Sequence, residues 1–110
     1  MRITGGALRG RNLVAPDDNR LRPTSDRVRQ AIFNILLHND LGVGFSVEGA
    51  KVIDLFAGTG ALGIEAVSHG AAFALLVDDS ADSRGIIRTN VEALQLTGAT
   101  KIWRRDATDL

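Results

Sequence analysis

Short apolar runs alternate with amphipathic stretches along the second half of the chain. The runs at 51–56 and 72–78 have the length and the apolar character of buried strands, and residues 100–104 are strand-like. The stretches between them, about 61–69 and 81–96, have helical spacing and end near glycines. Strands that alternate with helices predict an α/β fold with a parallel sheet, and right-handed crossovers give the strands the spatial order 3-2-1. We therefore expect the first half of a doubly wound sheet.

One more helix is predicted ahead of this sheet. Thr24, Ser25 and Asp26 supply helix-capping groups. Apolar residues follow at intervals of three to four, so we expect a helix over about 26–38 with one apolar stripe. The residues of this stripe are Val28, Ile32, Ile35 and Leu36.

The N-terminal part of the chain is rich in glycine and arginine. Residues 1–4 and 12–15 are candidate strands, which the glycines between them join into a small hairpin or an extended arm. We expect residues 1–23 to form this basic arm, and residues 24–110 to form a partial Rossmann-like domain.

Charge is distributed unevenly, although the formal net charge of the chain is zero. Residues 1–30 hold seven arginines and three aspartates, a formal charge of +4, so the remaining residues carry −4. The planar fork of arginine suits phosphates and base edges, so we expect the arm to contact phosphate groups. The arginines expected in this contact are Arg2, Arg9, Arg11, Arg22 and Arg27. A solvated hairpin with incidental charge is the alternative.

Arginines also gather at the start of the predicted helix. Arg22, Arg27 and Arg29 lie around its first turn, where cations oppose the helix dipole and invite an anionic partner. The alternative is that they pair with Asp26 or with acids elsewhere in the chain.

The most informative stretch is residues 51–67, KVIDLFAGTGALGIEAV, which predicts a strand, a glycine loop and a helix. Gly58 and Gly60 permit backbone angles closed to other residues and bring the main chain against a ligand. Gly63 lets the helix pack close to the strand. Dinucleotide-binding enzymes use the same spacing, so the glycines alone do not identify the ligand.

Three acids at the ends of predicted strands narrow the choice of ligand. Asp54 lies four residues before Gly58, where a fixed negative charge favours a cationic, amino-acid-like ligand over a pyrophosphate. Asp78 is placed to accept hydrogen bonds from a ribose diol, and Asp106 is placed to accept one from an adenine amino group. S-adenosylmethionine fits, because it has an ammonium and a sulfonium group and no phosphate. A pocket for a nicotinamide cofactor is the alternative. Asp79, next to Asp78, is either a partner of the helix dipole or a substitute for Asp78 in the ribose contact.

Five blocks of sequence together carry a family resemblance: RITGGALRGRNL, LRPTSDRVRQAIFNIL, DLFAGTGALGIEAVSHGA, and the VDD and RDA ends of the second and third strands. In these blocks the chain resembles the bacterial 16S rRNA guanine-N2 methyltransferases. The resemblance implies a class I methyltransferase sheet, S-adenosylmethionine as cofactor, and 16S rRNA or a small-subunit assembly intermediate as partner. It also implies that the arginine-rich arm contacts this RNA. The implied cofactor-binding residues are Asp54, Phe56, Ala57, Gly58, Thr59, Gly60, Asp78 and Asp106.

The chain departs from the family pattern in two places. Adjacent aspartates, Asp78 and Asp79, stand where family members often have two acids separated by one residue, so both are candidates for the ribose contact. The family's Asn or Asp followed by Pro-Pro and an aromatic residue is absent, because the only prolines are Pro16 and Pro23. We therefore assign no catalytic residue and expect a fragment without turnover of its own. In such a fragment the apolar strand 51–56 is an open edge, which predicts self-association.

Composition excludes several other classes of protein. The chain has no cysteine, which excludes disulfides and thiolate metal sites, and we expect no metal site. No apolar run approaches the roughly 20 residues of a membrane span, so we expect a cytoplasmic protein without membrane contact. Two other functions stay open: half of an NAD(P)-dependent oxidoreductase, and a non-enzymatic RNA-binding module in which the arm makes the functional contacts.

Overall fold

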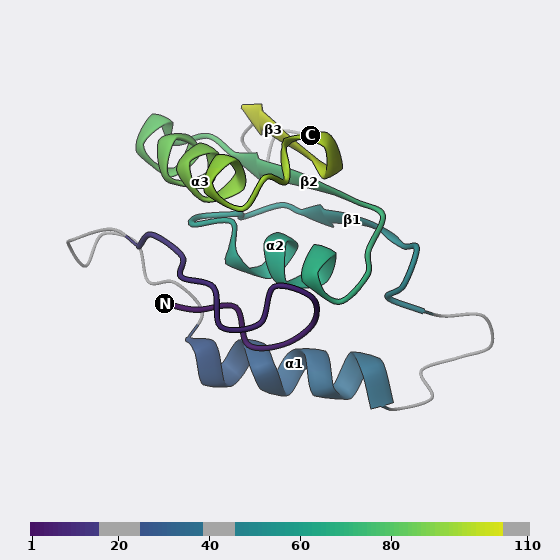
Figure 1. Cartoon of the computed structure of the whole chain (residues 1–110). Coiled ribbons are helices and arrows are strands. Elements are labelled where there is room, and N and C mark those ends of the chain that lie inside the picture. The colour runs from purple at the N-terminus through teal and green to yellow at the C-terminus, as the bar shows by residue number, and fades with distance from the viewer. Residues whose placement is uncertain (16–24, 39–45, 105–110) are drawn as a thin grey trace.

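The structure is a computed structural model that describes residues 1–15, 25–38 and 46–104 (Figure 1). Its elements are α1 (Asp26–His38), β1 (Lys51–Asp54), α2 (Ala61–Ser68), β2 (Phe73–Asp78), α3 (Ala81–Ala93), the 3-10 turn η1 (Thr97–Ala99) and β3 (Thr100–Arg104). Within these segments, none of the helices has the length and apolarity needed to cross a bilayer.

The strands form one parallel sheet in the order β1-β2-β3. Ile53 of β1 aligns with Leu75 of β2, and Leu76 aligns with Ile102 of β3. Helix α2 packs on β1 and β2, α3 packs on β2 and β3, and α1 lies beyond α2 on the side away from the sheet (Figure 1). This arrangement confirms the predicted α/β class and the strand order 3-2-1.

Several predicted boundaries were wrong. The strand predicted over 51–56 ends at Asp54, because the chain turns there toward the glycine loop. The helix predicted over 81–96 ends at Ala93, and Gln95 then takes a positive φ of 58° that no helix accommodates. The predicted hairpin strands at 1–4 and 12–15 reduce to one antiparallel bridge between Arg2 and Asn12, because side chains of α2 and α3 take up backbone groups of this segment.

The buried face of α1 also differs from the prediction. Val28 and Ile35 of the expected apolar stripe are each 51% exposed, and Ile32 is 37% exposed. The buried residues of α1 are instead Arg29 and Phe33. The reason is an acid on α2 that holds the guanidinium of Arg29 in the interior, which sets the rotation of the helix about its axis.

This acid is Glu65, whose side chain is fully buried, accepts hydrogen bonds from two parts of the chain and lies close to a histidine in a third. From the N-terminal segment, the amides of Thr4 and Gly5 donate to it at 2.9 and 3.1 Å, and the Thr4 hydroxyl donates at 3.0 Å. From α1, Arg29 Nε donates at 2.9 Å. From the end of α2, His69 Nε2 lies at 3.3 Å. Because a buried carboxylate requires such compensation, these contacts fix the N-terminal segment and α1 on α2.

The N-terminal residues 1–15 run along α2 and belong to the main core (Figure 1). Ile3 and Leu13 are 1% and 5% exposed and pack in one cluster with Leu76 and Ile87. The predicted division of the chain after residue 23 falls outside the described residues and stays a prediction.

Gly63 sets the separation between α2 and the sheet, as its position in the sequence predicted. A Cβ added at Gly63 would lie 2.2 Å from Leu76 Cδ2, and Leu76 is fully buried. We expect Gly63→Ala to lower the free energy of unfolding by about 1–3 kcal/mol through overpacking. The matched control is Gly85→Ala in α3, where an added Cβ meets no atom within 4 Å. There the better helix propensity of alanine should raise stability by about 0.5–1 kcal/mol. Urea denaturation measures both effects, and stabilisation by both substitutions would contradict this account.

Candidate cofactor site

The predicted site residues gather at the carboxyl ends of β1 and β2. Asp54 is the last residue of β1, Asp78 is the last residue of β2, and the glycine loop leads from β1 into α2. Gly58 and Gly60 have positive φ values of 56° and 84°, the left-handed region that favours glycine. A Cβ added at Gly58 meets no atom within 4 Å, so this part of the loop faces open space in which a ligand can approach the main chain.

The protein itself satisfies most of the loop amides. The Ala57 amide donates to the Val77 carbonyl at 3.0 Å, and the Gly60 amide donates to the Ala57 carbonyl at 2.7 Å. The Gly58 amide donates to Asp78 Oδ2 at 2.9 Å. A phosphate-binding loop presents free amides to its ligand. Here a carboxylate already occupies the Gly58 amide, so the loop offers a poor site for an anion.

Asp54 is the unsatisfied acceptor of the site. Its Oδ1 atom accepts a hydrogen bond from the Phe56 amide at 3.3 Å. Its Oδ2 atom is buried and accepts no hydrogen bond from any described residue. Burial raises the pKa of Asp54 above 3.8, the hydrogen bond from Phe56 opposes this rise, and the nearby charge of Asp78 adds to it. A cationic group next to Oδ2 would compensate both the desolvation and the repulsion.

Asp78, rather than Asp79, is turned toward the loop. Its second oxygen, Oδ1, accepts from the Ser80 amide at 2.9 Å, so one carboxylate joins the glycine loop to the start of α3. The side chain of Asp79 is exposed. Each Asp78 oxygen retains a lone pair, so the geometry leaves room for the predicted ribose contact, which stays a prediction.

The other predicted cofactor residues differ in exposure. Phe56 is 75% exposed beside the loop, whereas Thr59 is only 3% exposed and Ala57 is buried. Asp106 lies outside the described residues. A mainly apolar groove of about 530 Å³ borders Asp54 and runs between α1, β1 and α2.

The β1 side of this groove is open. Among the described strands, β1 pairs only with β2, and Ile53 is 63% exposed. Self-association through this edge stays a prediction.

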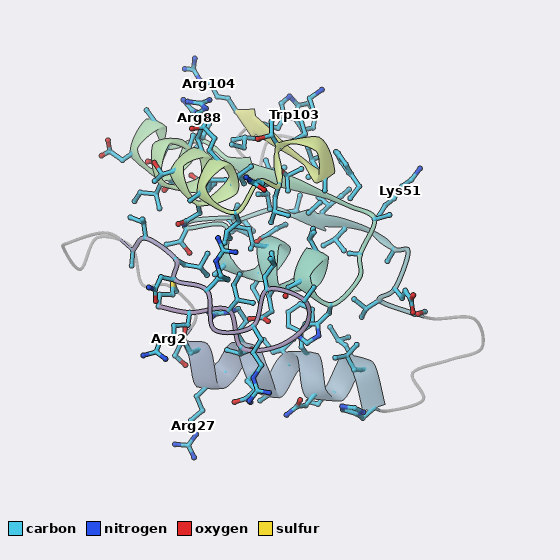
Figure 2. All side chains as sticks on the ribbon, viewed as in Figure 1. Arg2, Arg27, Lys51, Arg88, Trp103 and Arg104 are labelled. Atoms are coloured by element: carbon cyan, nitrogen blue, oxygen red, sulfur yellow. The ribbon has the colours of Figure 1, made fainter. Side chains whose placement is uncertain are left out.

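The arginines predicted to contact RNA are on the surface where they are described. Arg2, Arg9, Arg11 and Arg27 are exposed, and Arg22 lies outside the described residues. Arg2 and Arg27 extend away from the body of the molecule near the start of α1 (Figure 2), where the Arg2 amide donates to Asp26. Arg29 is different, because it is buried against Glu65 and Asp26. For Arg29, therefore, the alternative of an internal partner was correct.

Two polar residues with structural importance were missed from the sequence. Glu65 lies among apolar residues of the α2 stretch, and Asn90 lies between Ile87 and Val91, two residues of the buried face of α3. In each case the available signal was a polar residue on a face that its neighbours mark as buried.

We expect Asp54→Asn to stabilise the folded protein at pH 7. Because the pKa of Asp54 is raised in the folded state, ionisation of this carboxyl destabilises the folded protein at every pH at which Asp54 is ionised in the unfolded chain. The neutral side chain of asparagine removes this destabilisation. The gain should be full well above the raised pKa and should disappear below pH 3.8, where both states of Asp54 are protonated. Thermal unfolding at pH 7 and at pH 3 measures this difference. A lower Tm for the variant than for the unaltered protein at pH 7 would contradict the raised pKa of Asp54.

Comparison with known proteins identifies the family. Residues 1–110 match the family model described as "Conserved hypothetical protein 95". "Ribosomal RNA small subunit methyltransferase D" of Escherichia coli K12 is 46% identical over 89 residues, which are 80% of this chain and 41% of that protein. "Putative rRNA methyltransferase YlbH" of Bacillus subtilis 168 is 36% identical over 107 residues, which are 97% of this chain and 54% of that protein.

A solved structure agrees with this result. "Putative methyltransferase yhhF from Escherichia coli" matches with a TM-score of 0.81 and 35% identity, over 99% of this chain and 54% of that one. The chain therefore spans about half the length of the curated relatives that it matches. It has the methyltransferase fold, is similar to small-subunit rRNA methyltransferases, and is a member of the Conserved hypothetical protein 95 family.

Proposed function

We propose that this chain binds S-adenosylmethionine and is part of an enzyme that methylates guanine N2 in 16S rRNA. The observation that carries the proposal is the buried Asp54 oxygen without a hydrogen-bond donor, beside a loop whose Gly58 amide is already taken by Asp78. Two carboxylates and few free amides favour a cationic ligand. They disfavour the pyrophosphate of a nicotinamide dinucleotide, which is the ligand of the rival oxidoreductase function.

Each part of the proposed ligand has a complementary group in the chain. The Asp54 carboxylate would hold the ammonium of the amino-acid end, and the open side of Gly58 would admit the main body of the ligand. Asp78 would accept from the ribose diol, and the exposed Phe56 ring would cover the adenosine. When bound, S-adenosylmethionine supplies a methyl group activated by its sulfonium. The chain contributes the position of this donor and a negative electrostatic environment.

The proposed substrate is RNA, contacted by the exposed arginines of the N-terminal segment and α1. The names of the relatives support rRNA as the substrate, and that of the Escherichia coli relative supports rRNA of the small subunit. We propose that this rRNA is free or within an assembly intermediate, and that the protein acts in the cytoplasm. Transfer from a sulfonium to an amine is direct, so it needs neither a metal nor a covalent enzyme intermediate. The 110-residue chain lacks the Pro-Pro-aromatic block, and we expect it to bind cofactor without turnover.

Calorimetry tests the cofactor. We expect S-adenosylhomocysteine to bind and NAD not to bind, because only the former presents an ammonium in place of phosphates. Asp54→Asn should weaken binding at least tenfold, the order of magnitude for one charge-assisted hydrogen bond. The control is Asp82→Asn, which removes the same charge from an exposed position in α3 and should leave the affinity within twofold. Binding of NAD, or equal binding by Asp54→Asn, would overturn the proposal.

A salt titration tests the RNA contact. We expect the double variant Arg9→Gln/Arg11→Gln to lose affinity for small-subunit rRNA. The slope of log K against log salt should fall by roughly 1.4–1.8, since each phosphate contact contributes about 0.7–0.9. Lys51→Gln is the control, because Lys51 is exposed at the amino end of β1, away from the strand ends that form the site (Figure 2). An unchanged slope would refute the contact. RNA binding without any cofactor binding would favour the non-enzymatic module.

A further inference from the structure

The side chain of Asn90 connects two regions that are far apart in the sequence. It projects from α3 into the interior, where Asn90 is 2% exposed. Its Oδ1 atom accepts from the Val14 amide at 2.6 Å. Its Nδ2 group donates to the Val14 carbonyl at 3.1 Å and to the Thr59 carbonyl at 2.9 Å. Both Nδ2 protons and the carbonyl oxygen of the side chain are therefore in use.

On one side, Asn90 fixes the cofactor loop. Thr59 lies between the two glycines with positive φ, and its carbonyl belongs to the same peptide unit as the Gly60 amide. That amide closes the loop by donating to the Ala57 carbonyl. A rotation of this peptide unit would break both hydrogen bonds, so Asn90 holds the bend in the shape that exposes Gly58.

On the other side, Asn90 fixes the basic N-terminal segment. Val14 follows the buried Leu13, whose amide donates to the Met1 carbonyl. The same segment carries the exposed Arg9 and Arg11, and the Arg11 guanidinium lies 3.5 Å from the Ala93 carbonyl at the end of α3. One amide side chain thus joins the loop proposed to hold the cofactor to the segment proposed to hold RNA.

We propose that Asn90 is a positioning residue that shapes the cofactor loop and couples its occupancy to the N-terminal segment. The inference rests on the proposed function, because it assigns the loop to S-adenosylmethionine. A ligand that immobilises the loop also immobilises Asn90 and, through it, Val14. By linkage, a ligand that orders the arm favours cofactor binding by the same factor.

The first test compares two variants that loosen the same segment. Asn90→Ala removes the contacts to both Val14 and Thr59, and we expect S-adenosylhomocysteine to bind about five- to tenfold more weakly. The matched control is Ser68→Ala. The Ser68 hydroxyl donates to the Gly5 carbonyl at 2.6 Å and accepts from the Leu8 amide at 2.9 Å. No described contact joins this hydroxyl to the loop, so its loss should leave the affinity within twofold.

The second test uses the unaltered protein, so it does not depend on the folding of a variant. Hydrogen exchange is followed at two amides of the N-terminal segment, each bonded to a helix side chain: Val14 to Asn90, and Leu8 to Ser68. Saturating S-adenosylhomocysteine should slow exchange at Val14 severalfold and leave Leu8 unchanged. A purely structural role of Asn90 predicts no difference between the two amides.

The outcomes separate this inference from the proposed function. If the unaltered protein binds S-adenosylhomocysteine, but Asn90→Ala binds equally well or Val14 exchange is unaffected, the role of Asn90 is refuted and the cofactor assignment stands. If Ser68→Ala weakens binding as much as Asn90→Ala, general loosening of the segment explains the effect and the inference fails. If the unaltered protein does not bind S-adenosylhomocysteine, the proposed function fails and this inference fails with it.

Discussion

The arrangement of the N-terminal segment, α1 and α2 depends on one buried carboxylate. Glu65 has no exposed surface, and an ionised group in that position is tolerated only when several donors surround it. Those donors come from Thr4 and Gly5 in the N-terminal segment and from Arg29 in α1. Each of these segments is therefore held against α2 by the need to compensate the same charge.

The ion pair between Arg29 and Glu65 shows which features of the fold could be predicted from the sequence and which could not. The strands and the helix α1 follow from local patterns of apolar residues, and the strand order follows from right-handed crossovers; both are confirmed. The orientation of α1 follows instead from a contact between residues 29 and 65, which no local pattern contains. Apolar periodicity pointed to Val28 and Ile35 as the inner face, and these side chains are half exposed. The predicted hairpin or extended arm forms only one antiparallel bridge for the same kind of reason, because backbone groups of the N-terminal segment bond to side chains of distant helices.

The candidate site shows a similar division. The strand ends place Asp54 and Asp78 at one edge of the sheet, so the topology was sufficient to bring them together. Their different surroundings could not be read from the sequence. Asp78 accepts two backbone amides, whereas one oxygen of Asp54 lacks a donor among the described residues. Asn90 stood out in the sequence only as a polar residue on a buried face, because its partners Val14 and Thr59 are far from it in the chain.

The two hydrogen bonds of Asp78 have a consequence for molecular recognition. The Asp78 carboxylate accepts hydrogen bonds from both the Gly58 and the Ser80 amides and so fixes the conformation of the glycine loop. The loop therefore has its shape before a ligand binds. Association then loses little conformational entropy of the backbone, and more of the contact energy is retained as affinity. The length of the side chain is also constrained, because an additional methylene at position 78 would displace either the bend or the first turn of α3. Position 78 therefore requires a short side chain as well as a negatively charged one.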